Sequence, residues 1–239
     1  MTDTPASPAP GPPVTLITGG GTGIGAAIAR QLLERGHRVT ITGRRDERLR
    51  ELAGELGNPA SLLTVSGDAA DYGDVTAAVQ ASVTGFGRLD AVVANAGCRT
   101  SDGIAEGDPA GWRDMVLTNV LGPALLIRAA LPALKQTGGR IVLVGSVAGT
   151  IYTAGNIYGA TKWAVTGLAE NTRRMVTGDG VGVTLVNPGR VATRFGDADS
   201  GLPMLTADQL AAAIVWAISQ PGGVDVNTLT IRPVGVAIA

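Results

Sequence analysis

The sequence has few of the residues that build disulfides and metal sites. Its 239 residues include one cysteine, Cys98, and one histidine, His37. A single cysteine cannot form an internal disulfide, and one thiol with one imidazole is a poor donor set for a metal. His37 lies in a polar turn between a predicted helix and a predicted strand. We therefore expect no metal site and interpret His37 as a surface residue.

Strong charge and long apolar runs are also missing. The formal net charge is -1, so no basic field is available to attract nucleic acid or an acidic membrane. No apolar run has the length that a bilayer requires. The first thirteen residues are rich in Pro and Ala and lack the basic and apolar regions of a secretory signal. We interpret residues 1–13 as a disordered tail, and expect a cytoplasmic location, a small-molecule partner and no nucleic-acid or membrane partner.

What the chain does have is glycine and aliphatic residues in a regular alternation. Aromatic residues make up only 3% of the sequence, which suits a parallel sheet buried between helices. Short β-branched runs predict strands at 14–18, 38–42, 61–66, 90–94, 140–145, 182–186 and 227–232. Longer amphipathic stretches between them predict helices at about 23–35, 46–56, 71–86, 110–136, 155–177 and 206–219.

This alternation predicts an α/β fold of the Rossmann type. About seven parallel strands form a doubly wound sheet with helices on both faces, in a single domain spanning residues 14–239. Such sheets bind ligands outside the carboxyl ends of their strands. The residues that follow each strand are therefore the candidates for function.

The first strand runs into Thr18-Gly19-Gly20-Gly21-Thr22-Gly23-Ile24-Gly25, which opens a helix. Glycine lets the backbone approach a pyrophosphate, and the helix N-terminus offers free N–H groups to it. A tight turn without any ligand would also use glycine. The position at the first strand-to-helix crossover favours a dinucleotide-binding loop. The expected contacts are Gly19, Gly21, Thr22, Gly23, Ile24 and Gly25.

Tyr158 and Lys162 are spaced one helical turn apart, so their side chains share a face. An ammonium beside a phenol lowers the phenol pKa toward the pH at which acid–base catalysis works well. Ser146, at the end of the fifth predicted strand, can donate a hydrogen bond to a substrate oxygen. Alone, the Tyr and Lys would also suit an exposed helix pair. Together with Ser146 and the glycine loop, they predict a catalytic group.

The second predicted strand ends in Gly43-Arg44-Arg45. An acid at this place favours NAD by bonding the ribose hydroxyls, whereas an Arg accommodates the 2′-phosphate of NADP. We expect Arg44 and Arg45 to bind that phosphate and NADP(H) to be preferred over NAD(H). The alternative is a solvated basic turn.

The glycine spacing, together with these elements, resembles the short-chain dehydrogenase/reductase family. The resemblance covers residues 14 to 239 and implies that Asn119 belongs to the catalytic group with Ser146, Tyr158 and Lys162. An amide in an apolar helix needs partners if it is buried, although a surface or interface Asn is the alternative. The further cofactor contacts that the resemblance implies, besides Tyr158 and Lys162, are Asp68, Ala69, Asn95, Ala96, Gly97, Pro188, Gly189, Val191 and Thr193.

The resemblance says less about the substrate. It implies that the segment from 193 to 205 covers the substrate, and we expect Cys98, Tyr152 and Phe195 to line the pocket. Cys98 has no histidine to activate it, which favours a packing thiol over a nucleophile. One departure from the family bears on the cofactor: many NADP-preferring members carry a basic residue where this loop has Thr22.

The expected function is that of an NADP(H)-dependent oxidoreductase that moves a hydride between the nicotinamide and a carbonyl or secondary alcohol, with Tyr158 as acid and base. An NAD(H)-dependent alcohol dehydrogenase of the same fold and a non-catalytic dinucleotide sensor are the alternatives, and the intact Ser, Tyr and Lys set argues against the sensor. Sugar epimerisation would need a larger substrate domain. A homotetramer is expected from the resemblance and from apolar residues beyond what one sheet face should bury, namely Val116, Leu117, Leu121, Leu125 and Leu168.

Overall fold

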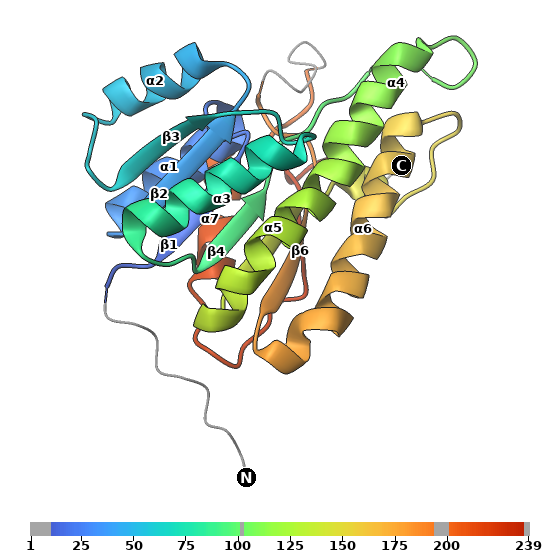
Figure 1. Ribbon diagram of the computed structural model, residues 1–239. Coiled ribbons are helices and arrows are strands. Elements are labelled where there is room, and N and C mark those ends of the chain that lie inside the picture. The colour runs from blue at the N-terminus through green and yellow to red at the C-terminus, as the bar shows by residue number, and fades with distance from the viewer. Residues whose placement is uncertain (1–10, 101–102, 194–200, 237–239) are drawn as a thin grey trace.

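The computed structural model describes residues 11–100, 103–193 and 201–236 (Figure 1). Most of the expected N-terminal tail, residues 1–10, lies outside the described residues.

One parallel sheet of seven strands forms the centre of the molecule. The strand order is β3-β2-β1-β4-β5-β6-β7, and each neighbouring pair is parallel. The predicted doubly wound fold is thus confirmed, with each strand within two residues of its expected bounds. The strands are β1 Val14–Thr18, β2 Arg38–Gly43, β3 Leu62–Ser66, β4 Ala91–Ala94, β5 Arg140–Val144, β6 Gly182–Pro188 and β7 Thr228–Ile231.

Helices cover both faces of this sheet. One buried cluster packs α3 (Tyr72–Phe86), α5 (Gly122–Thr137) and α6 (Ile157–Val176) against the sheet. Figure 1 shows these three on one side of the strands. The other cluster packs α1 (Gly23–Glu34), α2 (Asp46–Glu55) and α7 (Ala207–Ile218) against the opposite face. Neighbouring strand residues enter different clusters, as Leu16 and Ile17 do in β1. This is why a central strand such as β4 is apolar at every position.

The predicted helix over residues 110–136 is interrupted. It consists of α4 (Pro109–Val116), a π-helical turn at Leu117–Leu121, and then α5. Two local features favour the wider turn. Pro123, at the start of α5, has no N–H to give to the preceding turn. Asn119, inside the turn, is held by hydrogen bonds to another loop. Hydrophobic periodicity does not register one extra residue in a turn, so the sequence could not reveal this.

The same stretch corrects the expectation about long apolar segments. Pro109–Thr137 has the length and composition of a membrane-crossing helix, with an 18-residue window that is 39% buried. It packs on the sheet through a row of core residues, Leu126, Ile127, Ala130 and Leu134. Its exposed side chains are of mixed character and include apolar ones. Val116 and Leu121 are 44% and 40% exposed there.

Candidate active site

The chain order reverses between β1 and β4, and a cleft of about 800 Å³ opens at the carboxyl ends of the strands there. The loops after β1, β2, β3, β4, β5 and β6 all contribute to it. Most residues singled out from the sequence lie on its wall, namely Gly19, Gly21, Thr22, Gly23, Ile24, Arg44, Arg45, Asp68, Ala69, Asn95, Ala96, Gly97, Ser146, Tyr158, Lys162, Pro188, Gly189, Val191 and Thr193.

The glycine loop packs so closely against its neighbours that side chains would clash at several of its positions. Gly19 and Gly23 have φ values of +65° and +56°, which favour glycine. A Cβ on Gly19 would lie 2.9 Å from Cα of Ala96. Gly25 is not on the cleft wall, and a Cβ there would lie 2.3 Å from the carbonyl oxygen of Gly19. Gly25 therefore lets α1 start directly under the loop, so that the N–H groups of the helix face the cleft.

A clasp between Thr18 and Asn95 fixes this loop. The Asn95 side-chain amide donates to the carbonyl oxygens of Thr18 and Gly19, at 3.0 Å each. In return, Thr18 Oγ1 accepts from the backbone N–H groups of Asn95 and Ala96, at 3.2 Å each. Asn95 thus fixes the backbone at the start of the glycine loop. Thr18, a buried strand residue, was not among the site residues identified from the sequence.

Arginines gather where β2 ends. Arg44 and Arg45 line the cleft, and so does Arg48 from the first turn of α2. Arg48 was missed, although it lies one helical turn beyond Arg44 and a helix-spacing argument could have found it. Position 43 has room, because a Cβ on Gly43 would meet only a Leu49 methyl at 3.8 Å. The corner can therefore hold a phosphate without an opposing acid on the second strand.

Asp68 closes the same corner from the loop after β3. Its Oδ1 accepts from the N–H of Ala70 at 2.9 Å, and its own N–H donates to Asp74 at 2.8 Å. These two bonds hold the loop at the cleft edge.

Ser146, Tyr158 and Lys162 converge at the other end of the cleft. Ser146 follows β5, and its N–H donates to Asn187 Oδ1 at 3.2 Å. Tyr158 lies in the first turn of α6, where its hydroxyl is hydrogen-bonded to Ser146. Lys162, one turn later, donates from Nζ to the carbonyl oxygen of Val144 at 2.9 Å. That Nζ lies 5.7 Å from the centre of the Tyr158 ring.

Burial dominates the acid–base properties of this group. Burial lowers the pKa of Lys162 to about 8, with the nearby Cys98 thiol opposing the change. Burial also raises the pKa of Tyr158, while its hydrogen bond with Ser146 and the charge of Arg99 lower it. The sequence-based expectation that Lys162 lowers the Tyr158 pKa is not met in this geometry. The reason is that loss of hydration outweighs the neighbouring charges, and the ammonium faces the Val144 carbonyl.

Asn119 and Cys98 lie behind the wall rather than on it. Asn119 is 1% exposed and clamps the backbone of Cys98 from both sides. Its Oδ1 accepts from the Cys98 N–H and its amide donates to the Cys98 carbonyl, both at 2.8 Å. The amide also donates to Thr161 Oγ1 at 3.1 Å. Asn119 thereby joins the loop after β4 to the helix that carries Lys162.

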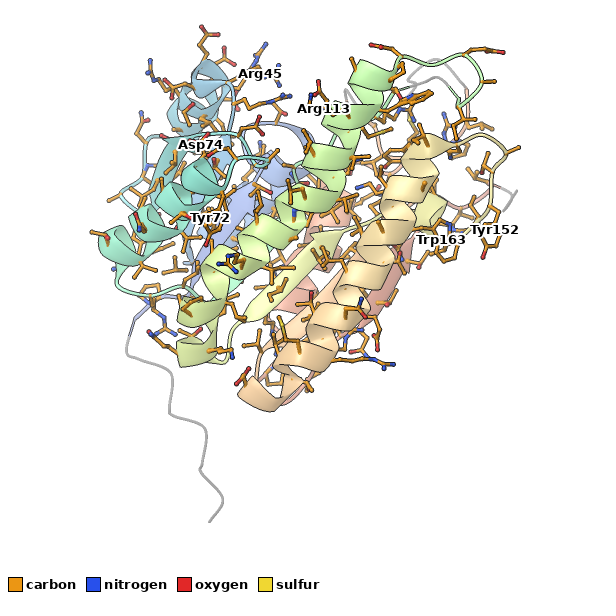
Figure 2. The ribbon with its side chains drawn as sticks, turned by 45° about the vertical axis from the view of Figure 1, so that its right-hand side comes forward. Arg45, Tyr72, Asp74, Arg113, Tyr152 and Trp163 are labelled. Carbon is orange, nitrogen blue, oxygen red and sulfur yellow. The ribbon has the colours of Figure 1, made fainter. Side chains whose placement is uncertain are left out.

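The structure does not place Tyr152 in the pocket. Its side chain is 91% exposed and stacks on Trp163, with ring centres 5.2 Å apart (Figure 2). The Trp163 indole in turn donates to the carbonyl of Ile151 at 3.1 Å, which turns this loop outward. Phe195 lies outside the described residues.

Two further arginines on the wall were missed. Arg99 and Arg190 come soon after the ends of β4 and β6. The rule that ligands bind beyond strand ends could have found both. Across the described ranges, no group of three or more His, Cys, Asp or Glu side chains could hold a metal ion.

Comparisons with known proteins agree with this geometry. The family model described as short chain dehydrogenase matches residues 13–200. An uncharacterized oxidoreductase of Staphylococcus epidermidis is 36% identical over 229 residues, covering 92% of this chain and 97% of its own.

Among solved structures, the closed form of a serine dehydrogenase complexed with NADP⁺ is 32% identical, with a TM-score of 0.88 and 95% and 97% of the two chains covered. A 3-ketoacyl-(acyl-carrier-protein) reductase of Brucella melitensis, complexed with NADH, is 28% identical, with a TM-score of 0.84 and coverages of 92% and 96%. The chain therefore belongs to the short-chain dehydrogenase/reductase family and is an NAD(P)-dependent oxidoreductase.

Proposed function

We propose that the protein reduces a carbonyl compound with NADPH, or oxidises the matching alcohol with NADP⁺, and that Tyr158 is its acid and base. One observation carries this proposal: Ser146, Tyr158 and Lys162 share a single cleft with the glycine loop that precedes α1. A bound nicotinamide supplies or accepts the hydride. The protein's own residues handle the proton and hold the reactants.

Tyr158 is suited to give a proton in the reductive direction. Its pKa is raised by burial, so the hydroxyl stays protonated at neutral pH. Ser146 can polarise the substrate carbonyl by a hydrogen bond as negative charge develops on the oxygen. In the oxidative direction the phenol must lose its proton. The hydrogen bond with Ser146, which lowers the Tyr158 pKa, then favours the phenolate.

The remaining site residues position these groups. Asn119 ties the loop after β4 to α6, so it acts on the reaction through Lys162 and the cleft wall. The glycine loop and the Asn95 clasp support the pyrophosphate, and Lys162 contacts the nicotinamide ribose in this proposal. A non-catalytic dinucleotide sensor would have no use for the Ser146–Tyr158 hydrogen bond, and this favours the enzyme.

Replacing Tyr158 with Phe should lower kcat by a factor of about 10² or more, because the general acid is lost. Cofactor affinity should change little, since the ring is kept. The measurement is NADPH oxidation against a panel of ketones and aldehydes, with cofactor binding followed by fluorescence. Tyr152→Phe is the matched control and should keep full activity, because that side chain points away from the cleft. A Tyr158→Phe enzyme with more than a third of the wild-type kcat would show that another group is the acid.

The burial of Lys162 predicts a pH dependence of stability. Its pKa is about 8 in the folded protein and near 10.5 when exposed. Between these values the unfolded chain binds more protons than the native one, so stability rises with pH. Relative to Lys162→Met, the wild type should gain about 2 kcal/mol of unfolding free energy from pH 7 to pH 10.

Urea denaturation of both proteins at several pH values measures this difference. Lys135→Met removes an exposed lysine that is paired with Asp179, and its curve should run parallel to that of the wild type. A parallel curve for Lys162→Met as well would mean that the buried ammonium keeps its ordinary pKa.

NADP(H) should be preferred over NAD(H) by about ten-fold or more, through charge-assisted contacts of Arg44 with help from Arg45 and Arg48. Arg44→Asp should reverse the preference, because it replaces attraction of the 2′-phosphate by repulsion. The measurement is the ratio of kcat/KM for the two cofactors at fixed salt. Arg50→Asp makes the same charge change on the outer side of α2 and should leave the ratio alone. A wild-type preference for NADH would mean that these arginines form only a solvated turn and do not bind the 2′-phosphate.

We also propose a homotetramer assembled through α4, α5 and α6. The basis for this proposal is the exposed apolar surface of Pro109–Thr137, which includes Val116 and Leu121. Light scattering should give a mass near four times 24.1 kDa. Val116→Lys with Leu121→Lys should lower that mass, and Val224→Lys, a change of similar exposure on a distant loop, should not. A monomeric wild type at micromolar concentration would refute the proposal.

A cytoplasmic location stays a prediction.

A further inference from the structure

Cationic side chains outnumber acidic ones on the wall of the catalytic cleft. Among its described lining residues six are cationic, and only Asp68 is acidic. Three of the cations, Arg44, Arg45 and Arg48, come after β2. A fourth is Lys162. The remaining two, Arg99 and Arg190, lie after β4 and β6, and the transfer of a hydride and a proton gives neither of them a role.

Arg99 is held firmly at the catalytic end. The residue before it, Cys98, has both its N–H and its carbonyl bonded to Asn119 at 2.8 Å. Asn119 is almost fully buried and is bonded to Thr161 on α6. The backbone at Arg99 is thereby fixed relative to the helix of Tyr158 and Lys162. Its side chain is exposed on the cleft wall, where a ligand can reach it.

The guanidinium also lies within electrostatic reach of the acid–base group. The charge of Arg99 lowers the pKa of Tyr158, whereas Arg190 is not among the groups that shift it. Arg99 lines the same cleft as Ser146 and Tyr158, so a substrate group bonded to its guanidinium would be held in the cleft that contains the reacting atoms.

We propose that Arg99 determines substrate specificity by binding an oxyanion, a carboxylate or a phosphate, on the carbonyl compound that the enzyme reduces. The inference rests on the proposed function and adds the substrate class to it. Guanidinium matches both oxyanions through two parallel hydrogen bonds, which fixes the orientation of the substrate as well as its affinity. Because the side chain is exposed, the selectivity should lie near ten-fold, the lower part of the range for charge-assisted bonds.

Matched substrate pairs separate charge from carbonyl chemistry. Acetoacetate against methyl acetoacetate tests a carboxylate, and dihydroxyacetone phosphate against dihydroxyacetone tests a phosphate. Each pair is assayed by NADPH oxidation with wild type, Arg99→Gln, Arg99→Lys and Arg35→Gln. Arg35 is an exposed arginine outside the cleft wall, so its replacement makes the same change in net charge. Calorimetry then measures binding of acetoacetate and dihydroxyacetone phosphate to the NADP⁺ complexes of the same proteins.

The expected result is a kcat/KM about ten-fold higher for the charged member of one pair in the wild type and in Arg35→Gln. Arg99→Gln should remove that preference by lowering kcat/KM for the charged member about ten-fold more than for the neutral member, and Arg99→Lys should keep part of it. The charged compound should also bind Arg99→Gln more weakly in the calorimeter. The pair that shows the effect identifies the oxyanion.

Three results would overturn the proposal: no charge preference in the wild type, a preference that survives in Arg99→Gln, or an equal loss for both members of a pair. The last would mean that Arg99 only shapes its loop. Reduction of the neutral ketones without any charge preference would refute the role of Arg99 and leave the reductase function standing. If no compound is reduced, the proposed function fails in this panel. The calorimetry still decides whether Arg99 binds an oxyanion, since unchanged affinity in Arg99→Gln would refute it.

Discussion

The close approach of two backbones at the ends of β1 and β4 is the constraint on which the site depends. Thr18 and Asn95 bond across this gap, and a Cβ on Gly19 would lie 2.9 Å from Ala96. The contact brings the glycine loop and the loop of Ala96 together at the place where the chain order reverses. The N-terminus of α1 then faces the cleft. The chain that follows Ala96 reaches Cys98, whose backbone is bonded to Asn119. Cofactor support and catalytic geometry therefore share one anchor.

Burial sets the chemistry at the other end of the cleft. A hydrated lysine and tyrosine titrate near 10.4 and 10, far from neutral pH. Loss of hydration brings the Lys162 pKa down to about 8 and moves the Tyr158 pKa up. The two shifts make Tyr158 a protonated donor beside a cation whose charge can change within the working range. The ammonium is kept in a buried place by the Val144 carbonyl, a backbone acceptor that carries no charge of its own.

The fold was predictable from the sequence because its signals are local. Apolar runs, crossover lengths and glycines at strand ends all survive in the one-dimensional pattern, and the strands agree within two residues. The π-helical turn at Asn119 was not predictable, since it arises from a bond to Cys98 in another loop. Tyr152 was misplaced for a related reason. Its contact with Trp163 turns it outward, and no spacing rule encodes that stacking. Arg99 and Arg190 could have been found by asking which residues follow the strand ends.

The formal net charge of the whole chain does not describe the distribution of charge in the cleft. The chain carries a formal net charge of -1, which excludes a strong overall attraction for polyanions. Yet the described wall of the cleft carries six cationic residues and one acidic residue, and one of the six, Arg48, is paired with Glu51 just outside that wall. In a cleft with low-dielectric walls such a concentration of one sign focuses the potential on the ligand. The arginines after β2 and Arg99 after β4 lie on loops on the two sides of β1. A dinucleotide phosphate and an anionic substrate can therefore both be attracted without competing for one arginine, while the surface as a whole stays neutral.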